Sequence, residues 1–219
     1  MSWFYYVGRV LVRIALLLFA RWQIKGRENI PGQGPLLVVA NHINLADPPL
    51  LAVSLTRKAI FMAKEELFRS RFSAYFIGGF GVFPVHRAQM DRKALRQAGK
   101  ILADGLALIM FPEGTRSKNA QLQPAFSGSA LIAFHSGVTI LPAGITGTER
   151  IKGAGWLLRR PRLTVNFGTP FHLPPVNGKL TRTELTELTN VMMGHIAELL
   201  PVEYRGSYAE QRKSDDAKG

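Results

Sequence analysis

Short apolar runs and longer amphipathic stretches alternate along the chain from residue 36 onward. The apolar runs predict buried strands at Leu36–Ala40, Ala59–Met62, Gly81–Val85, Leu106–Phe111, Val138–Ala143 and Leu163–Phe167. The stretches between them predict helices at Pro49–Thr56, Leu67–Phe76, Asp91–Ala103, Gly128–His135 and Arg182–Leu199. This alternation predicts an α/β fold in which helices flank a largely parallel central sheet.

The N-terminal segment, residues 1–30, has a different pattern. Trp3 to Ala20 is aromatic and aliphatic, with Arg9 and Arg13 one helical turn apart. The uninterrupted apolar part is shorter than the roughly 20 residues that cross a bilayer. We expect an amphipathic helix that lies in the membrane interface, with its arginines reaching lipid phosphates. The alternative is a helix packed on the protein's own core, since buried helices show the same apolar surface.

Composition narrows the chemistry. The chain has no cysteine, which excludes disulfides, thiolate zinc sites and a cysteine nucleophile. Its net charge of +13 favours a polyanionic partner. Because no helix-turn-helix, RNP-like, KH-type or paired Cys/His motif is present, we expect no nucleic acid and favour an anionic membrane surface at the cytoplasmic face. A merely solvated basic surface is the alternative.

Two further segments bear on this prediction. Residues Trp156–Arg162 combine apolar side chains with arginines, which is typical of a second membrane contact or, equally, of a surface loop entering a strand. The last residues, 204–219, are polar, and we expect a disordered tail there. The remaining residues, 31–203, would then form one domain.

His42 and Asp47 directly follow the first predicted strand. Asp47 precedes Pro48, a pattern that predicts the N-cap and first position of a helix. A strand-to-helix turn could bring the aspartate within hydrogen-bond reach of the histidine, fix its tautomer and let it take a proton from a hydroxyl. The alternative is that Asp47 only caps its helix.

Polar residues also follow other predicted strands. Glu113, Gly114, Thr115 and Arg116 come after Leu106–Phe111, and Arg87 comes after Gly81–Val85. Glycine allows close backbone approach to a ligand, and arginine can hold a phosphate through two parallel hydrogen bonds. Lys64, which follows the strand predicted at Ala59–Met62, is a weaker candidate for binding a phosphate. The alternatives are a surface Glu–Arg ion pair and solvated basic side chains.

Taken together, four segments resemble, in order and spacing, the four blocks of the glycerolipid acyltransferases, and most closely of the 1-acylglycerol-3-phosphate acyltransferases. They are Asn41–Asp47, Gly81–Arg87, Phe111–Ser117 and Ile140–Ala143. The resemblance covers about half of the chain and would make residues 31–203 an acyltransferase domain.

The resemblance implies transfer of a fatty acyl group from acyl-CoA or acyl carrier protein to the free hydroxyl of lysophosphatidic acid. It implies His42 as the general base and Asp47 as its orienting partner. Arg87 and Arg116 would hold the acceptor's phosphate. The residues implied to help bind the acceptor are Glu113, Gly114, Thr115 and Lys64. Direct attack by the hydroxyl requires neither a metal nor a cofactor, and we expect none.

Departures from the family pattern leave the acceptor open. His86 stands where an acidic residue is frequent, and the fourth block lacks a second proline. A different lysophospholipid or a lyso-aminolipid is therefore an alternative acceptor. A non-catalytic basic peripheral membrane protein is a further alternative, although it does not explain polar pairs at two strand ends.

Overall fold

One mostly parallel sheet forms the centre of the molecule. The computed structural model describes residues 3–64, 82–85, 92–175 and 180–209. Within these ranges seven strands pair in the order β1–β7–β6–β2–β5–β3–β4. Only the β6–β7 pairing is antiparallel. The strands are β1 (Arg21–Lys25), β2 (Leu36–Ala40), β3 (Ala59–Lys64), β4 (Val82–Val85), β5 (Ala107–Met110), β6 (Thr139–Thr146) and β7 (Arg162–Phe167). The predicted α/β fold is confirmed.

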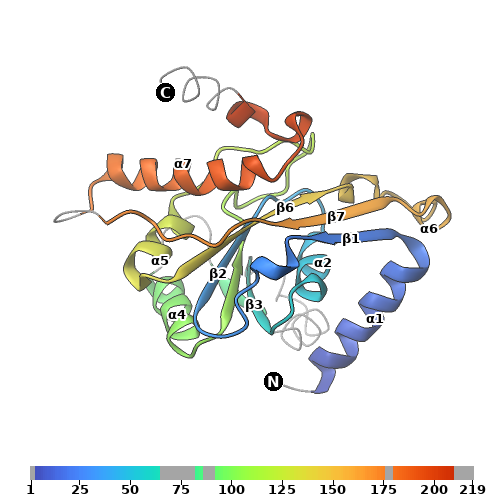
Figure 1. Cartoon of the computed structure of the whole chain (residues 1–219), viewed down its shortest axis with the longest axis horizontal. Helices are drawn as coiled ribbons and strands as arrows, with labels where there is room; N and C mark the ends of the chain where they lie inside the picture. Colours follow the sequence, from blue (N-terminus) through green and yellow to red (C-terminus); the bar gives the residue numbers. More distant parts are fainter. Residues whose placement is uncertain (1–2, 65–81, 86–91, 176–179, 210–219) are drawn as a thin grey trace.

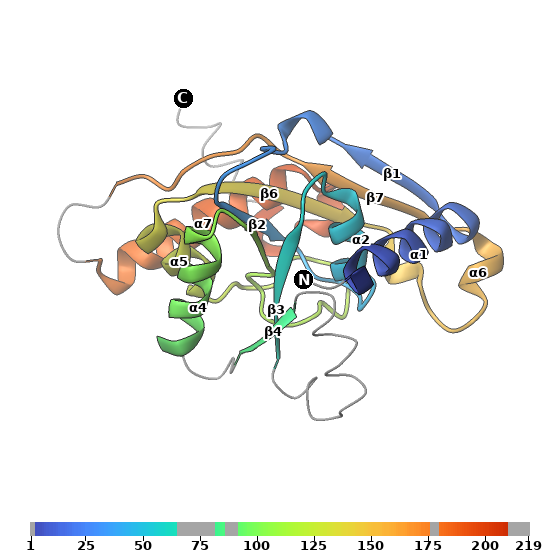
Figure 2. The ribbon, with the colours of Figure 1, turned by 90° about the horizontal axis from the view of Figure 1, so that it is seen from below.

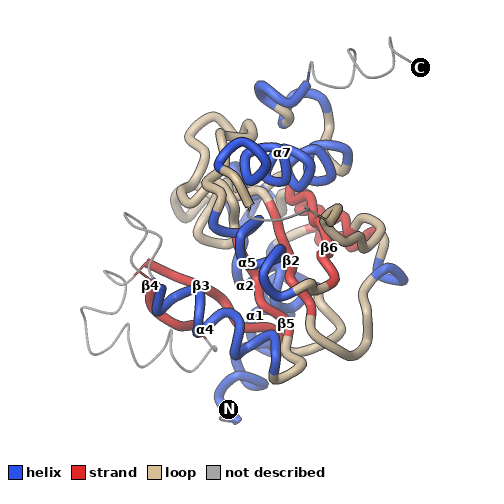
Figure 3. The backbone as a smooth tube through the Cα atoms, turned by 90° about the vertical axis from the view of Figure 1, so that its left-hand side faces the viewer, coloured by secondary structure: helices blue, strands red, loops and turns tan. Residues whose placement is uncertain are grey.

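Helices cover both faces of the sheet (Figures 1 and 2). One face carries α1 (Trp3–Phe19) and α2 (Asp47–Ser54), and the other carries α4 (Arg92–Ala103), α5 (Gly128–Ser136) and α7 (Arg182–Glu198). The strands run through the middle of the molecule, with α7 on one side and the N-terminus on the other (Figure 3). Shorter helices are α6 (Trp156–Arg159), η1 (Arg27–Asn29), η3 (Thr148–Arg150), η4 (Val202–Tyr204) and η5 (Gly206–Ala209).

The central strand β2 is buried on both faces, which explains its unbroken apolar sequence. Leu36 and Val38 pack in the core beneath α2, whereas Leu37 and Val39 pack in the core beneath α4, α5 and α7. Because β2 lies between β6 and β5, its carboxyl end opens in the middle of the sheet. Ligand sites of parallel α/β sheets lie beyond this edge.

Strand β1 was not predicted from the sequence. It forms an edge of the sheet beside β7, and its exposed residues alternate with half-buried Trp22 and Ile24. Polar residues at the exposed positions interrupt the apolar pattern, so the sequence does not predict a strand there. The predicted strands for β2 to β7 and the predicted helices for α2, α4, α5 and α7 are confirmed to within a few residues. The predicted helix Leu67–Phe76 lies outside the described residues.

The arginines of α1 do not point away from the protein, contrary to the sequence-based expectation. Arg9 donates to the backbone oxygens of Leu55 and Arg57, at 2.8 and 3.2 Å, and Arg13 donates to Val53 O at 3.2 Å. These carbonyls belong to the end of α2 and the turn after it, where helical partners are missing. The side of α1 that carries the arginines, Tyr5 and Leu16 therefore packs on the protein, and most of its remaining apolar residues face outward. No helix in the described ranges is long and apolar enough to cross a bilayer.

The chain remains ordered beyond residue 203, which also differs from expectation. Residues up to Ala209 form η4 and η5, and Tyr208 is 9% exposed. The two tyrosines, Tyr204 and Tyr208, supply the apolar contacts that a polar tail would lack. They pack with the core beneath α7. Residues 210–219 lie outside the described residues.

Candidate active site

The loop after β2 carries the His42–Asp47 pair. Asn41 anchors its start, because its side chain exchanges two hydrogen bonds with the backbone of Ile145, at 2.9 and 2.7 Å. Asn41 is buried and Ile145 belongs to β6, so this pair ties the carboxyl end of β2 to the neighbouring strand. His42 therefore leaves the sheet from a fixed backbone position.

Asp47 orients His42 directly. The Nδ1 atom of His42 lies 2.9 Å from Oδ2 of Asp47, and the two residues are 7% and 0% exposed. The same oxygen accepts the backbone N–H groups of Ile43 and Asn44, at 2.6 and 2.7 Å. A carboxylate can only accept, so the shared proton belongs to Nδ1 and Nε2 keeps its lone pair. This is the tautomer that a general base requires.

The expected helix cap at Asp47 is wrong. Asp47 is the first residue of α2, Ala46 occupies the cap position, and no side chain caps this helix. The carboxylate instead bonds backward, to the loop that carries His42. Its other oxygen, Oδ1, is buried and has no hydrogen-bond partner in the described part of the chain. The aspartate thus holds the loop and the imidazole together with one atom.

Phe111 and Glu113, which follow β5, complete the surroundings of His42. The imidazole stacks on the Phe111 ring, with 4.2 Å between centroids and an interplanar angle of 22°. Glu113 accepts the His42 N–H through Oε1 at 2.8 Å and the Gln123 N–H through Oε2 at 2.9 Å. The Glu113 carboxylate therefore bridges two loops. The sequence did not predict that Phe111 contacts His42, and it gave no indication that Gln123 belongs to the site. No sequence motif marks either contact.

Burial raises the pKa of Glu113 to about 7, and the charge of Asp47 adds to this rise. The two backbone N–H groups act in the opposite direction because they stabilise the carboxylate. Glu113 is 1% exposed. A group of this kind can change its charge near neutral pH at the centre of the site.

Gly114 to Ser117 continue the loop after Glu113, with Thr115 and Arg116 at the surface and Ser117 buried. Gly114 has φ of +66°, and a Cβ atom there would lie 2.7 Å from the ring of Phe126. Thr115 and Arg116 are exposed, and the N–H of Ser117 donates to His42 O at 2.8 Å. The structure thus places Arg116 on the loop that contacts His42, with its side chain at the surface.

The other two predicted basic residues are placed less completely. Lys64 ends β3, where its backbone is in register with Val85 of β4, but its side chain is outside the described part. Arg87 lies outside the described residues altogether. Both strands are parallel to β5, so their carboxyl ends lie at the same edge as His42. Their roles stay predictions.

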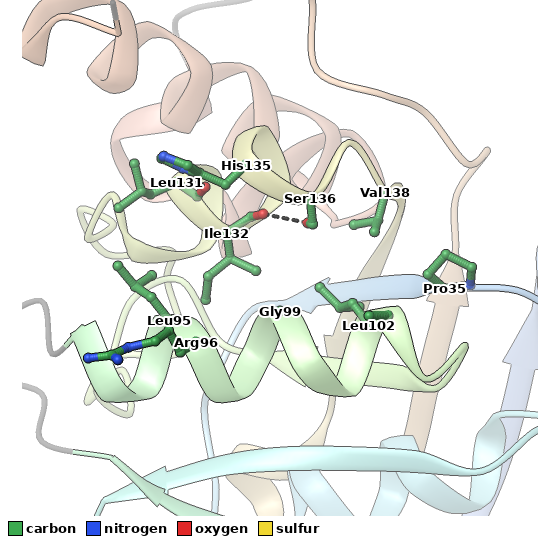
Figure 4. A pocket seen from close by; sticks show the side chains of 11 residues that line it. Pro35, Leu95, Arg96, Gly99, Leu102, Leu131, Ile132, His135, Ser136 and Val138 are labelled. Carbon is green, nitrogen blue, oxygen red and sulfur yellow. Dashed lines mark hydrogen bonds between the residues drawn. The ribbon is translucent and has the colours of Figure 1, made fainter.

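A groove of about 450 Å³ lies elsewhere, between α4 and α5 (Figure 4). Its lining includes Leu95, Leu102 and Ile132, with Pro35 and Val138 at one end. Pro35 precedes β2 and Val138 precedes β6, so the groove reaches the amino-terminal edge of the sheet. It contains none of the predicted site residues.

A buried His–Asp pair at the carboxyl edge of a mostly parallel sheet has the geometry of a general base and its orienting partner in an α/β transfer enzyme. The family model described as Acyltransferase matches residues 21–146, more than half of the chain. The chain belongs to this acyltransferase family.

Named relatives agree with this assignment. A 1-acyl-sn-glycerol-3-phosphate acyltransferase of Streptococcus pneumoniae is 34% identical over 74% of this chain and 62% of the relative. One from Bacillus subtilis is 24% identical over 86% of this chain and 92% of the relative. The chain thus spans less than two thirds of the pneumococcal relative, and 44% of a chloroplastic relative from Brassica napus.

A solved structure shares the fold. The crystal structure of the 1-acyl-sn-glycerophosphate (LPA) acyltransferase PlsC from Thermotoga maritima superposes with a TM-score of 0.67 and 28% sequence identity. The match covers 90% of this chain and 78% of that chain. The similarity therefore extends well beyond the residues around His42.

Proposed function

We propose that the chain transfers a fatty acyl group from a thioester, acyl-CoA or acyl carrier protein, to the free hydroxyl of 1-acylglycerol-3-phosphate. The product would be phosphatidic acid. The observation that carries this proposal is the buried His42–Asp47 pair, with 2.9 Å between Nδ1 and Oδ2. The names of the relatives support the choice of acceptor.

In this mechanism Nε2 of His42 takes the proton of the acceptor hydroxyl as its oxygen attacks the thioester carbonyl. The new C–O bond forms, a tetrahedral intermediate collapses and the C–S bond breaks. The proton on Nε2 then passes to the departing thiolate, so that a thiol and an ester result. Asp47 stabilises the imidazolium that exists between these two transfers.

Positive side chains supply the phosphate site. Arg116 lies on the loop whose Ser117 N–H bonds to His42 O, so a phosphate held by Arg116 keeps the acceptor near the base. Arg87 and Lys64 would add charge from the neighbouring strand ends. Glu113, Gly114 and Thr115 contribute by shaping this loop, and the buried Glu113 acts through its two backbone partners.

The acceptor is a lipid, and exposed apolar residues lie beside the site. Leu45 follows His42 in its loop, Phe126 contacts the Gly114 backbone position, and the two side chains are 63% and 67% exposed. Such side chains can contact an acyl tail while the phosphate is bound nearby. We propose that they guide the lipid acceptor toward His42.

We further propose that α1 and α6 together face the membrane. The outward side of α1 exposes Trp3, Leu11 and Leu17, and Leu158 of α6 is 91% exposed. The two helices join where Phe19 meets Trp156 edge to face at 6.4 Å, and where Arg160 donates to Leu17 O at 3.0 Å. An apolar surface edged by arginines fits an anionic bilayer.

The proposal is tested by measuring product from lysophosphatidic acid with each donor type, using wild type, His42→Ala and His135→Ala. We expect His42→Ala to lose about 10²- to 10⁴-fold in rate, the range of general base catalysis, with its thermal unfolding close to wild type. His135 is exposed on α5, so its variant serves as the matched control. Full activity of His42→Ala would exclude it as the base.

A panel of lyso-acceptors in the same assay identifies the acceptor. Preference for lysophosphatidic acid would support the proposed phosphate site at Arg116. Preference for another lysophospholipid or a lyso-aminolipid would keep the acyl transfer and replace the acceptor. No thioester turnover with any acceptor would favour a non-catalytic membrane protein.

A further inference from the structure

Residues 202–209, which comprise η4 and η5 and which we term the C-terminal clamp, contact two segments that border the His42 loop. One is the loop 117–126 after β5. The other is the turn 147–151 after β6, which includes η3. These segments are held to the His42 loop by separate hydrogen bonds. The clamp therefore connects the two sides of the site from outside it.

The first contact is with the loop 117–126. Leu122 N–H donates to Tyr204 O at 2.8 Å, and a Cβ atom on Gly206 would lie 2.6 Å from Leu122 O. The backbone of Ala125 hydrogen bonds to the buried Tyr208 hydroxyl. Gln123, in the middle of this loop, donates to Glu113, whose other oxygen holds His42 N–H. Thus the clamp is connected to His42 through the loop 117–126 and the carboxylate of Glu113.

The second contact is made by the Tyr204 side chain. Its hydroxyl donates to Glu149 Oε1 at 2.9 Å, and the Gly147 backbone hydrogen bonds to the same hydroxyl. Burial and the bond to Glu149 raise the pKa of Tyr204 to about 12, so the hydroxyl remains a donor at neutral pH. Glu149 Oε2 is buried without a partner in the described part of the chain, although Arg150 lies 3.4 Å from Oε1.

From this turn the contacts continue to Asp47. Ile151 O, two residues after Glu149, accepts from Asn44 Nδ2 at 3.3 Å. Asn44 N–H in turn donates to Asp47 Oδ2, the oxygen that orients His42. Tyr204 is thus connected to His42 by one route through its backbone and by another through its hydroxyl.

We propose that Tyr204 is a positioning residue for acyl transfer, which holds the loops on both sides of the His42–Asp47 pair in register. It touches neither the reacting atoms nor the proposed phosphate site. This inference rests on the proposed function. The Tyr204 hydroxyl would support the position of His42, whereas the backbone contacts of the clamp would support the loop 117–126, which directly follows Arg116.

The kinetic test compares Tyr204→Phe, Gly206→Ala and Ser207→Ala. Tyr204→Phe removes only the hydroxyl, and we expect kcat to fall about ten-fold with little change in the KM for lysophosphatidic acid, because a small misplacement of the base costs rate. Gly206→Ala strains φ of +54° and pushes on Leu122 O, so we expect a several-fold higher acceptor KM. Ser207 is exposed in the clamp, and its variant should match wild type.

Amide hydrogen exchange tests the same inference without substrate. In Tyr204→Phe we expect faster exchange at Ile43 and Asn44, whose N–H groups donate to Asp47, and unchanged exchange at Val38 and Leu141 of the core. This readout holds even if the acceptor is another lipid or the protein shows no turnover. Uniformly faster exchange, or no change at Ile43 and Asn44 together with wild-type kcat, would overturn the role of Tyr204.

Discussion

Asp47 orients His42 through the same oxygen that holds the backbone of the His42 loop. Oδ2 lies 2.9 Å from His42 Nδ1 and accepts the N–H groups of Ile43 and Asn44. The pair is therefore built into the strand-to-helix connection and does not depend on two independently placed side chains. This shared oxygen makes the aspartate both a structural and a chemical partner of the histidine.

Replacing Asp47 with asparagine should separate these two roles. The amide oxygen can still accept backbone N–H groups, but it carries no charge to stabilise the imidazolium. We expect kcat to fall about 10²- to 10⁴-fold, with a smaller change in the acceptor KM, measured by product formation at saturating thioester. A variant with wild-type kcat would show that the charge of Asp47 is dispensable.

Replacing Arg116 with alanine should mainly weaken acceptor binding. Loss of a charged hydrogen bond to phosphate corresponds to roughly 10- to 100-fold in KM for lysophosphatidic acid. Lys118 is exposed in the same loop, so Lys118→Ala is the matched control for loss of one positive charge. Equal effects of the two substitutions would indicate general electrostatic attraction and argue against a specific phosphate contact.

Gly114 should tolerate a methyl group poorly for two separable reasons. A left-handed alanine costs about 1 kcal/mol, and its Cβ would also displace the Phe126 ring. Gly105 has φ of +72° and open space around it, so Gly105→Ala carries only the backbone cost. We expect a larger stability loss in urea unfolding for Gly114→Ala than for Gly105→Ala, and a higher acceptor KM only for Gly114→Ala. If both variants keep the wild-type KM, the loop conformation at Gly114 is not needed for the acceptor.

The buried Glu113 should make folding stability depend on pH. Its pKa is about 7 in the folded protein against 4.5 for the ordinary group, so the folded state binds the proton more tightly. The stabilisation of the folded state by the protonated Glu113 is fully present below about pH 4.5. It is lost as pH rises through 7, by an amount on the order of 3 kcal/mol. Urea unfolding of wild type and Glu113→Gln at pH 5 to 8 checks this.

The difference in unfolding free energy between wild type and Glu113→Gln isolates the contribution of Glu113, because the other titrating groups contribute equally to both proteins. We expect it to shift in favour of Glu113→Gln as pH rises. A difference that stays constant from pH 5 to 8 would mean that the carboxyl does not titrate in this range.

Membrane binding should depend on the outward side of α1 and on α6. We expect Leu11→Asp and Leu158→Asp each to reduce sedimentation with anionic vesicles several-fold, since a charge must then enter the apolar boundary. Val191 is an exposed apolar residue of α7, on the other face of the sheet, and Val191→Asp is the control. Equal losses in all three variants would argue against a membrane surface formed by α1 and α6.

The sequence by itself determined the order of buried strands and the residue types after them. An unbroken apolar run such as Leu36–Ala40 must be covered on both faces, which already indicates a central parallel strand. The spacing of His42 and Asp47 is short, so a single turn brings them together, and this pair could be predicted. Edge strand β1 was not predicted, because its alternating polar residues resemble a surface loop.

Only the tertiary structure decided which partners complete the site. Glu113 meets His42 across 71 positions, and Tyr204 meets Glu149 across 55, and no local pattern encodes either contact. Likewise, apolar periodicity shows that α1 is amphipathic, but not that Arg9 and Arg13 bond to the end of α2. The periodicity of apolar residues indicates how much of a segment is buried. The identity of the buried neighbour depends on how distant segments pack, and that is settled when the whole chain folds.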